Sequence, residues 1–449
     1  MRSNEIHFNK YIGVVEDIIV VNNKYSKLII DSSSENFLLS FEGNDLSEEN
    51  QIEYFLLEKI IDNREKKRLG ISIGSWVSLE ISNEYSGSGS DVTTFSLSSN
   101  QQEQSELISF ESRNINLATN EQISLFDKIW RPFESNVTFE KSEFYVDKIF
   151  HSVAVYDVGQ GLFTALVDEH EHPLAYVDIG YPIAAKRKFL PKLNNFNPFY
   201  YCDRKPIILT HLDWDHWGFA IISGLASKSK KTGTWKTHPN YKKNVIENDW
   251  FLRAPDHVRH SLGPSHVHLL YEISKSKNSS LNLLPHHFNE MKIGNLLILE
   301  TSSKNKNPTS SYLRNNEALT ASLISYEDED EAILICGDAE FRSINFTKNL
   351  KYVGIVAPHH GGKMDLSYFP QPFSINPIMA ISSGYYEYNN IPDQEFLLES
   401  YKKGWGVYGT FLKKICNRCG GLKNHISLNF GYKPECGCYM AESNNICLN

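Results

Sequence analysis

The sequence has no long apolar segment. No run approaches the roughly 20 apolar residues that a membrane-spanning helix needs, and the opening residues MRSNEIHFNKY lack the apolar core of a secretion signal. It also has no excess of positive charge: 45 Lys and Arg stand against 54 Asp and Glu, for a formal net charge of −9. We therefore expect a cytoplasmic protein with no membrane association. The average charge does not favour a polyanionic partner, although bound cations or a local basic patch can oppose it, so nucleic acid remains a candidate substrate.

Cysteine is scarce and unevenly placed. Of seven cysteines, four form two short pairs near the C-terminus: Cys416 with Cys419, and Cys436 with Cys438. In a chain without an export signal, such pairs favour metal ligation over disulfides. We expect a structural zinc site resembling a ribbon or knuckle, although the second pair is CxC and not CxxC. Free buried thiols are the alternative.

The chain is too long for one ordinary domain, with 449 residues of which 41% are hydrophobic. Residues 1–85 alternate β-branched and aromatic runs with turns, which predicts a small β-rich domain; one charged stretch, 48–68, looks helical. The pattern loosely resembles an OB barrel, a fold that can hold single-stranded nucleic acid. A packing module, or a module that binds a protein partner, is the alternative. Residues 86–122 are rich in Ser, Asn, Gln and Gly and predict a linker.

From about residue 145 strands alternate with helical segments. We expect an α/β domain over 145–400 and a Cys-rich segment over 401–449. Several of the expected strands end in polar residues. Ligand-binding side chains in layered α/β proteins lie at such strand ends, where loops can aim them inward.

The strongest motif is THLDWDHWG at 210–218. The apolar run IIL stops at Thr210, and the next six residues hold four metal-type side chains: His211, Asp213, Asp215 and His216. Imidazole nitrogen and carboxylate oxygen are ligands of hard and borderline divalent metals. Alternation at 211, 213 and 215 lets one extended loop present three of them to one side. A chance polar loop with two satisfied histidines is the alternative.

Three weaker motifs also follow apolar strands. Asp178 closes the strand AYVDIG, Asp338 ends AILICGD, and His359 and His360 end VGIVAPHHGG. A turn at Asp178 and a helix N-cap at Asp338 are their ordinary interpretations. A carboxylate at Asp338 could also bridge two cations, and paired histidines at a strand end favour a ligand role.

In order along the chain, these segments resemble the metallo-β-lactamase superfamily, and most closely the soluble hydrolase domain of ComEC-type competence proteins. That group typically shows DVGQG, a strand ending in Asp-x-Gly, HxDxDH in place of the superfamily's HxHxDH, a Gly-Asp and a terminal HHG. All five occur here, at Asp157–Gly161, Asp178–Gly180, His211–His216, Gly337–Asp338 and His359–Gly361. The segment NNEALTASLIS at 315–325 also resembles the NNxSLVL segment of that group.

The resemblance implies an αββα sandwich with one or two divalent ions, zinc or manganese, between its sheets. The implied ligands are His211 and Asp213 for one ion, Asp215 and His216 for the other, Asp338 as a bridge, and His359 or, if the strand register differs by one, His360. The expected catalytic residues are Asp215, His216 and Asp178, with Asp215 orienting or deprotonating the water.

The chain departs from the pattern at three places. Leu162 stands where those relatives often have Asp, and Phe219 replaces a second glycine. The superfamily's middle histidine is not obvious, because Asn316 lies near its place. Four histidines at 257, 260, 266 and 268 could contribute, although a solvated loop is the simpler interpretation.

The expected function is a metal-dependent hydrolase, a phosphodiesterase or nuclease by resemblance. A hydrolase of lactones, amides or small phosphoesters is the second hypothesis, since the fold hosts all of these. A non-catalytic metal-binding scaffold is the third, supported by the missing middle histidine. The competence proteins' transport role is not implied, because the chain has no membrane channel. Proteins that pair this fold with accessory domains occur in bacterial defence systems.

Overall fold

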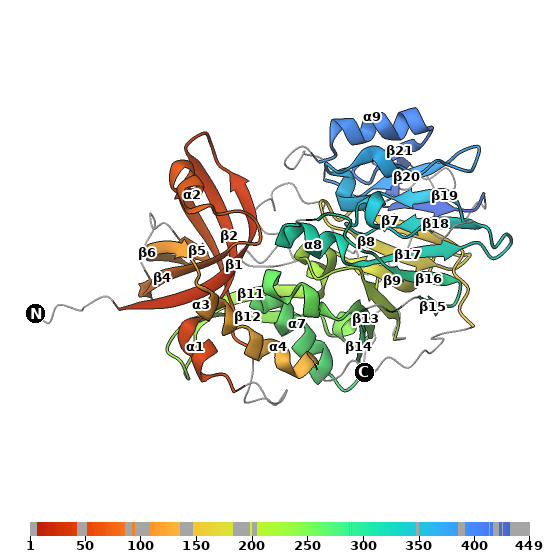
Figure 1. The fold of residues 1–449 in the computed structure, drawn as a ribbon. Coiled ribbons are helices and arrows are strands. Elements are labelled where there is room, and N and C mark those ends of the chain that lie inside the picture. Colours follow the sequence, from red (N-terminus) through yellow and green to blue (C-terminus); the bar gives the residue numbers. More distant parts are fainter. Residues whose placement is uncertain are drawn as a thin grey trace, which may run out of the picture.

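The structure is a computed structural model that describes residues 7–42, 52–85, 92–94, 108–134, 147–182, 198–199, 204–286, 288, 290–306, 308–346, 350–384, 391–412, 414–415, 422–423 and 425–431. It is of mixed α/β class, as the sequence predicts, with a closed six-stranded barrel and two seven-stranded sheets (Figure 1). The expected zinc ligands Cys416, Cys419, Cys436 and Cys438 lie outside the described residues. Among the described helices, none is long and apolar enough to cross a membrane.

The N-terminal barrel closes in the strand order β1–β2–β3–β5–β6–β4. Its strands are β1 (Phe8–Val20), β2 (Tyr25–Ser34), β3 (Phe55–Asp62), β4 (Trp76–Tyr85), β5 (Val92–Thr94) and β6 (Ser109–Leu117). Along β1, Tyr11 and Val15 lie in the barrel's own core, whereas Ile12 and Val14 lie in a core shared with the larger domain. The predicted β-rich domain is thus a barrel of six strands, one more than the five of an OB fold.

Two parts of the N-terminal region differ from expectation. The stretch 48–68, expected to be helical, contains β3 before the short helix α2 (Asn63–Leu69). β3 pairs along its whole length with β2, so pairing and burial outweigh its helix-favouring Glu and Lys residues. Residues 86–122, predicted as a linker, instead contain β5 and β6 in their described parts, and the helix α3 (Asn120–Ser124) begins there. Most positions of β6 are polar and at least partly exposed, so its composition resembles that of a linker.

Two seven-stranded sheets form the larger domain. The first contains, in order, β14 (Ser280–Leu284), β13 (Asp249–Arg253), β10 (Pro206–Leu209), β9 (Pro173–Ile179), β8 (Phe163–Val167), β7 (Ser152–Tyr156) and β24 (His425–Asn429). The second contains β15 (Met291–Ile293), β16 (Leu296–Glu300), β17 (Leu319–Ile324), β18 (Glu331–Ile335), β19 (Lys351–Val356), β20 (Ile378–Ile381) and β21 (Gly406–Gly409). Because β21 and β24 belong to these sheets, the domain continues past residue 400.

The remaining elements are short. The helices not yet named are α1 (Glu35–Ser40), α4 (Asp127–Glu134), α5 (Trp214–Trp217), α6 (Lys243–Ile246), α7 (Pro264–Lys275), α8 (Ser310–Asn316) and α9 (Gln394–Lys403). Two further strand pairs are β11 (Ile221–Lys228) with β12 (Trp235–Tyr241), and β22 (Lys414–Ile415) with β23 (Leu422–Lys423).

The two sheets share one apolar core. Val177 and Ile208 from the first sheet belong to the same buried cluster as Ile298 and Leu323 from the second. Side chains alternate between the two faces of a strand, so Ile207, next to Ile208, points to the outer face of the first sheet and lies in a separate cluster there. Both faces of β10 are therefore buried, which is the environment that its run of apolar residues predicts.

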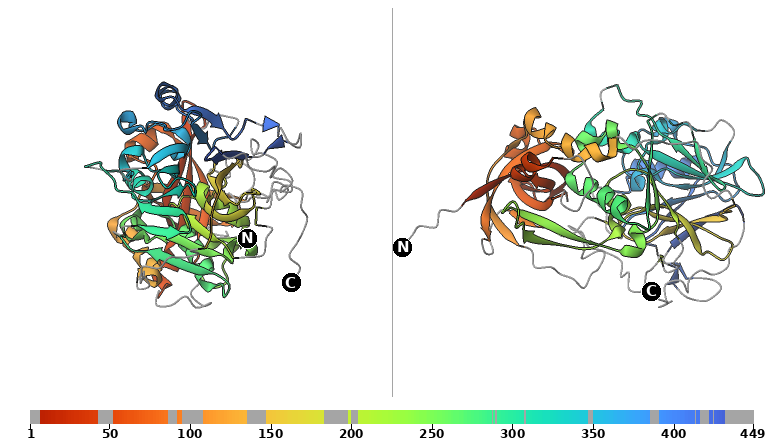
Figure 2. Two further views of the ribbon diagram at one scale, coloured as in Figure 1. Left: turned by 90° about the vertical axis from the view of Figure 1, so that its right-hand side faces the viewer. Right: turned by 90° about the horizontal axis from the view of Figure 1, so that it is seen from below.

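The barrel packs against the outer face of the first sheet. One buried cluster contains Ile12 of β1, Trp130 of α4, Leu269 of α7 and Ile207 of β10. The helix α7 lies between the barrel and the sheets (Figure 1), and the barrel occupies the opposite end of the molecule from the sheets (Figure 2). On the outer face of the second sheet, Phe396 of α9 packs into another cluster.

The junction between barrel and sheet domain requires a glycine at position 263. A Cβ built there would overlap the carboxylate of Asp31 on β2, which accepts hydrogen bonds from Ser265 at the start of α7. We predict that Gly263→Ala lowers the free energy of unfolding by about 1–3 kcal/mol through overpacking. Urea unfolding monitored by circular dichroism measures this change.

The matched control is Ser274→Ala, at an exposed position further along α7. It should change the free energy of unfolding by less than about 0.5 kcal/mol. Equal stability of Gly263→Ala and the native chain would contradict a tight junction at this point.

Candidate metal centre

The motif segment 210–216 leaves the end of β10 and turns directly into α5. β10 runs parallel to β9 on one side and β13 on the other, so its carboxyl end lies beside theirs. The short helix α5 starts at Trp214 and carries Asp215 and His216. Trp214 and Trp217 are buried on the opposite side of this turn, and the Trp217 indole donates to the carbonyl of Leu212. This packing fixes the loop that presents the polar side chains.

The end of β9 brings Asp178 beneath this loop. Asp178 has a left-handed backbone with φ of 58°, and Gly180 follows it. A Cβ on Gly180 would overlap the carbonyl oxygen of Asp215, and Leu162 donates its N–H to that same carbonyl at 2.8 Å. The Asp-x-Gly motif therefore allows the end of β9 to approach α5 closely. Leu162, one of the departures from the family pattern, serves this contact through its backbone.

The second sheet supplies the other side of the centre. Asp338 follows β18, and His359 and His360 follow the neighbouring parallel strand β19. Both histidines have positive φ values, 46° and 55°, before Gly361 at 74°. Such backbone costs about 1–3 kcal/mol for each non-glycine residue and persists only where surrounding contacts enforce it. The strain aims these two rings in different directions.

His211 and His216 are held by their Nδ1 atoms. Thr210 Oγ1 lies 3.1 Å from His211 Nδ1, and Asp178 Oδ2 lies 2.8 Å from His216 Nδ1. Asp178 also accepts from the N–H and the hydroxyl of Thr210, both at 2.7 Å. An anchor on Nδ1 fixes the ring and leaves Nε2 for a ligand, which is the arrangement of metal-binding histidines. Both Nε2 atoms consequently face the same interior space.

His360 is anchored in the same way. Its Nδ1 donates to the carbonyl oxygen of Ser382 at 2.8 Å, and its Nε2 lies 3.1 Å from Asp215 Oδ2. His360 is buried, whereas about a quarter of the Asp215 side chain is exposed. Of the two histidines that the sequence left open, His360 is thus the one whose Nε2 meets the motif segment.

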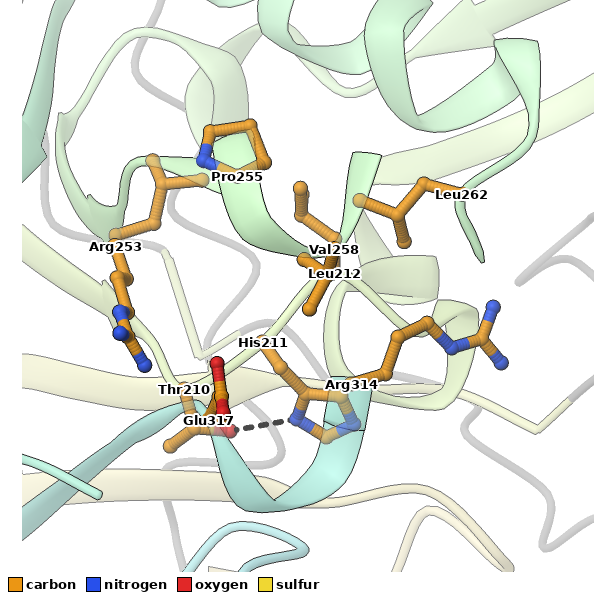
Figure 3. Close-up of a pocket in the computed structure, with 10 residues that line it drawn as sticks. Thr210, His211, Leu212, Arg253, Pro255, Val258, Leu262, Arg314 and Glu317 are labelled. Atoms are coloured by element: carbon orange, nitrogen blue, oxygen red, sulfur yellow. Dashed lines mark hydrogen bonds between the residues drawn. The ribbon is translucent and has the colours of Figure 1, made fainter. Parts of the chain in front are cut away.

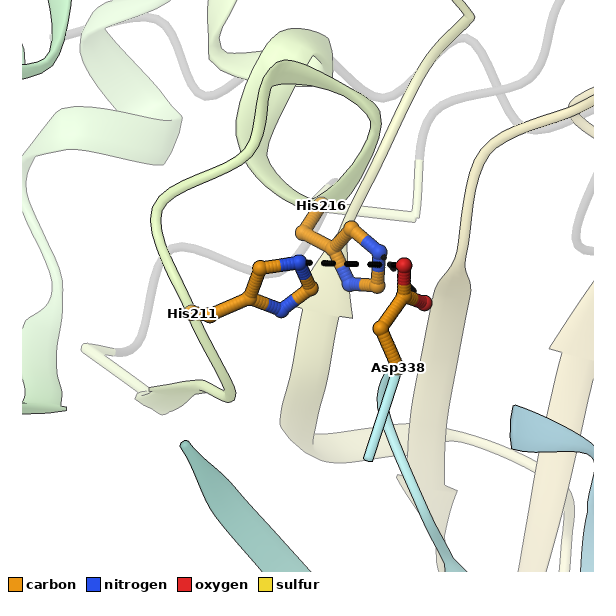
Figure 4. Close-up of side chains that lie close together, drawn as sticks. All are labelled: His211, His216 and Asp338. Carbon is orange, nitrogen blue, oxygen red and sulfur yellow. Dashed lines mark ion pairs between the residues drawn. The ribbon is translucent and has the colours of Figure 1, made fainter. Parts of the chain in front are cut away.

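The anchored rings converge with carboxylates into two overlapping groups. His211, His216 and Asp338 form one, and Asp215, His216 and His360 form the other; in each, the candidate ligand atoms lie within 4.8 Å of one another. Figure 4 shows the His211 and His216 rings side by side, facing Asp338. His216 Nε2 lies 3.1 Å from Asp338 Oδ1, and His211 Nε2 lies 3.9 Å from Asp338 Oδ2.

The centre favours positive charge and contains buried ligand atoms without hydrogen bonds. Among the described residues, His211 Nε2, His216 Nε2 and Asp338 Oδ1 are buried without a hydrogen bond of acceptable geometry. Burial alone would lower the pKa of His216, but Asp338 and Asp178 outweigh it and hold that pKa well above its usual value. Burial would likewise raise the pKa of Asp338, but His359 and His216 hold it well below normal. The centre therefore stabilises positive charge strongly, and buried unpaired ligand atoms are typical of an ion site.

His359 lies at the rim and points to Asp338 from outside. Its Nδ1 is 2.7 Å from Asp338 Oδ2 and 3.0 Å from Asn315 Nδ2. Its side chain is 41% exposed, the largest value of the predicted histidines in the centre. Burial lowers its pKa, but the Asp338 carboxylate dominates and raises it to about 9. The structure thus separates the two histidines of the HHGG motif into an interior and a rim residue.

Asp213 and Asp178, two predicted site residues, lie outside both groups. Asp178 is fully buried behind His216, and its carboxylate bonds that ring and Thr210, so it positions a ligand. Asp213 turns toward Arg314 of α8, whose Nε and Nη2 lie 3.0 and 3.3 Å from its two oxygens. Burial would raise the pKa of Asp213, but Arg314 outweighs this and holds it well below normal.

Two functional neighbours were missed by sequence reasoning, Arg314 and Glu16. Arg314 Nη1 lies 2.8 Å from Glu16 Oε2, and the other Glu16 oxygen lies 3.2 Å from His266 Nε2. The one local signal was the charged residue Glu16 inside the apolar strand β1. His266 and His268, expected in a solvated loop, are buried on α7 instead, because that segment forms the helix under the barrel.

A small pocket opens beside His211. Its lining includes Thr210, His211, Arg253, Arg314 and Glu317 (Figure 3). Its cavity volume is about 20 Å³, which is room for about one water molecule. Together with the exposed edge of Asp215, it marks where solvent reaches the centre. Asn316, near the place of the superfamily's middle histidine, accepts from the N–H of Glu340 and is not directed to the centre.

Comparisons with protein-family models and with curated proteins found no match to this chain. The functional assignment therefore depends on the order of the motifs and on the geometry of the centre.

Asp178→Asn tests the positioning of His216. Three donors face the Asp178 carboxylate, and an amide NH₂ in its place would oppose one of them. We predict that divalent-metal affinity falls by about 10–100-fold, the usual effect of losing the partner behind a ligand. Isothermal titration calorimetry of metal-free protein with Mn²⁺ or Zn²⁺ measures it.

Asp365→Asn is the control, because Asp365 is half-buried outside the centre, where it bonds Ser367 and Arg342. That variant should bind metal like the native chain. Unchanged affinity in Asp178→Asn would show that His216 does not ligate the ion through Nε2.

Proposed function

We propose that the chain is a metal-dependent hydrolase of the metallo-β-lactamase fold that cleaves phosphodiesters, with nucleic acid as its candidate substrate. The observation that carries the proposal is the set of three histidines anchored through Nδ1, with Nε2 atoms that converge with Asp215 and Asp338. Three imidazole rings that are all anchored through Nδ1, with Nε2 left for a ligand, are typical of a metal site and not of an incidental polar cluster.

The order of the sheets supports the proposed fold. Two sheets share a core, helices lie on the outer faces, and the polar side chains collect at strand ends. The DVGQG, HxDxDH, Gly-Asp and HHG segments are the loops that meet there. This is the arrangement that the αββα sandwich of the superfamily requires.

His216, His360, Asp215 and Asp338 are the residues that would hold a divalent ion, with His211 adjacent. When bound, such an ion activates water as a Lewis acid and neutralises charge that develops on the substrate's oxygens. Asp215 has the exposed carboxylate of the group and is placed to orient the attacking water and accept its proton. His359, at the rim, is placed to give a proton to the departing oxygen.

The choice of phosphodiesters rests on the resemblance to the competence-type motif set. Hydrolysis of a lactone, amide or small phosphoester uses the same activated water, so these substrates form the second hypothesis. The pocket beside His211 holds about one water, which leaves the exposed side of Asp215 and His359 as the approach for any substrate.

The double variant Asp215→Ala/His216→Ala tests the reaction. Metal-loaded protein is incubated with single- and double-stranded DNA and RNA, a chromogenic phosphodiester and a lactone. We expect phosphodiester cleavage by the native chain, and a loss of at least about 1,000-fold in the variant, because ion and proton acceptor are removed together. Circular dichroism should show that the variant remains folded.

The control variant Asp365→Ala/His260→Ala removes the same two side-chain types from a half-buried and an exposed position outside the centre and should keep full activity. Turnover that survives in Asp215→Ala/His216→Ala would place the reaction elsewhere. Lactone hydrolysis in the absence of phosphodiester cleavage would favour the second hypothesis. Metal binding without any turnover would favour a scaffold.

A further inference from the structure

The two candidate ligand groups compete for one atom. Both groups contain His216, and its Nδ1 is occupied by Asp178, so only Nε2 can bind an ion. A histidine nitrogen has one lone pair and binds one ion. If Nε2 binds an ion together with Asp215 and His360, the group around His211 loses its second histidine.

Two of the carboxylates that a second ion would need already face positively charged or donor side chains. Asp338 Oδ2 is 2.7 Å from His359 Nδ1, and both oxygens of Asp213 face Arg314. Three buried ligand atoms there have no hydrogen bond among the described residues: His211 Nε2, Asp338 Oδ1, which lies 3.1 Å from His216 Nε2, and Asp213 Oδ1, which lies 3.0 Å from Arg314 Nε. With Asp213 facing a guanidinium, His211 and Asp338 are two side chains, fewer than the three protein ligands of a catalytic zinc site.

The guanidinium of Arg314 provides positive charge beside Asp213. Its side chain is 4% exposed, and each of its three nitrogens meets a carboxylate: Nε and Nη2 face Asp213, and Nη1 faces Glu16. Nη1 also donates to the carbonyl of Ser261 at 2.9 Å. A guanidinium buried against two carboxylates in this way is not available to a substrate phosphate. Its charge neutralises buried carboxylates of the protein itself.

The barrel fixes the Arg314 guanidinium in position. Glu16 lies on β1 of the barrel, and it is held in turn by His266 of α7 at 3.2 Å. Breaking either carboxylate contact of Arg314 would leave buried charge uncompensated. The barrel therefore determines which side chain neutralises Asp213, the residue that stands where most of the superfamily has a histidine ligand.

We propose that the centre holds one divalent ion per chain, on the side of Asp215, His216 and His360, and that Arg314, fixed by Glu16 of the barrel, supplies the positive charge of a second ion at Asp213. This inference rests on the proposed metal-dependent function. It deepens that function, because a reaction at this centre has a single ion and a built-in guanidinium beside it.

Counting bound Mn²⁺ tests the inference. Manganese is the probe because thiolates bind it weakly, so ions held by the C-terminal cysteines do not enter the count. Metal-free full-length protein is equilibrated with excess Mn²⁺ by dialysis, the bound metal is measured by elemental analysis, and electron paramagnetic resonance separates an isolated ion from a spin-coupled pair. We expect one equivalent in the native chain, with the spectrum of an isolated ion.

Two variants probe the two roles. Asp213→Asn should keep one equivalent, because Asp213 is not a ligand. Arg314→Met removes the guanidinium from Asp213 and Glu16, so their buried negative charge is less well compensated. The variant should melt at a lower temperature without metal, take up a second Mn²⁺ and regain stability as it does so. Arg259→Met is the matched control: it removes a guanidinium that pairs with Glu134 and Asp127, away from the centre, and should bind one equivalent.

Two coupled ions in the native chain, or loss of the single ion in Asp213→Asn, would overturn the inference. If Arg314→Met does not fold, the ion counts of the native chain and of Asp213→Asn still test the inference. Two coupled ions with phosphodiester cleavage that depends on Asp215 and His216 would overturn the single-ion inference and leave the hydrolase proposal intact. One bound ion without any hydrolysis would support the single-ion inference and overturn the hydrolase proposal.

Discussion

The buried guanidinium of Arg314 is the contact on which the architecture around the centre depends. It joins Asp213 of the motif loop, Glu16 of the barrel and the carbonyl of Ser261 before α7. Burial alone would lower the pKa of Arg314, but Asp213 and Glu16 outweigh burial and raise it. Carboxylates inside a protein are tolerated only when paired, so each of the three elements needs the other two. The barrel is therefore a part of the centre and not a tethered accessory.

The same constraint explains why the polar residues gather where they do. Strands buried on both faces carry apolar side chains along their length, and polar groups can enter only where the strands end. The ends of β9 and β10 in one sheet face the ends of β18 and β19 in the other. Strained backbone at Asp178, His359 and His360 then turns side chains into the gap. The cost of that strain is offset by the contacts that anchor each ring, which is why sequence segments of so few residues can define the centre.

Patterns along the chain predicted the strand ends and the residue types there, because both are local properties. His211, Asp215, His216, Asp338 and His360 each lie within a few residues of the end of an apolar strand, and the structure brings them together. The role of Arg314 could not be predicted in this way. Its partners lie 101 residues away at Asp213 and 298 residues away at Glu16, and no local periodicity encodes such a pairing.

The barrel shows the same limit of local patterns. β3 looked helical because Glu and Lys interrupt its apolar residues, yet its pairing with β2 decides the outcome. β6 looked like a linker because only Phe110 and Ile115 of its side chains are buried. In both strands the fold is set by cross-strand partners, and propensity within the segment is the weaker term.

Exposure across the centre indicates which side a substrate can use. Arg314, Glu16 and His266 close the side toward the barrel, where their side chains are almost fully buried. Asp215 and His359 are open on the side of the second sheet. Under the proposed function, a nucleic acid would approach past Asp215 and His359, whereas β1 of the barrel directs Ile12 and Val14 into the shared core. That face of the barrel therefore has a packing role. It is buried against the sheet domain, so it has no exposed surface with which to hold a nucleic-acid strand.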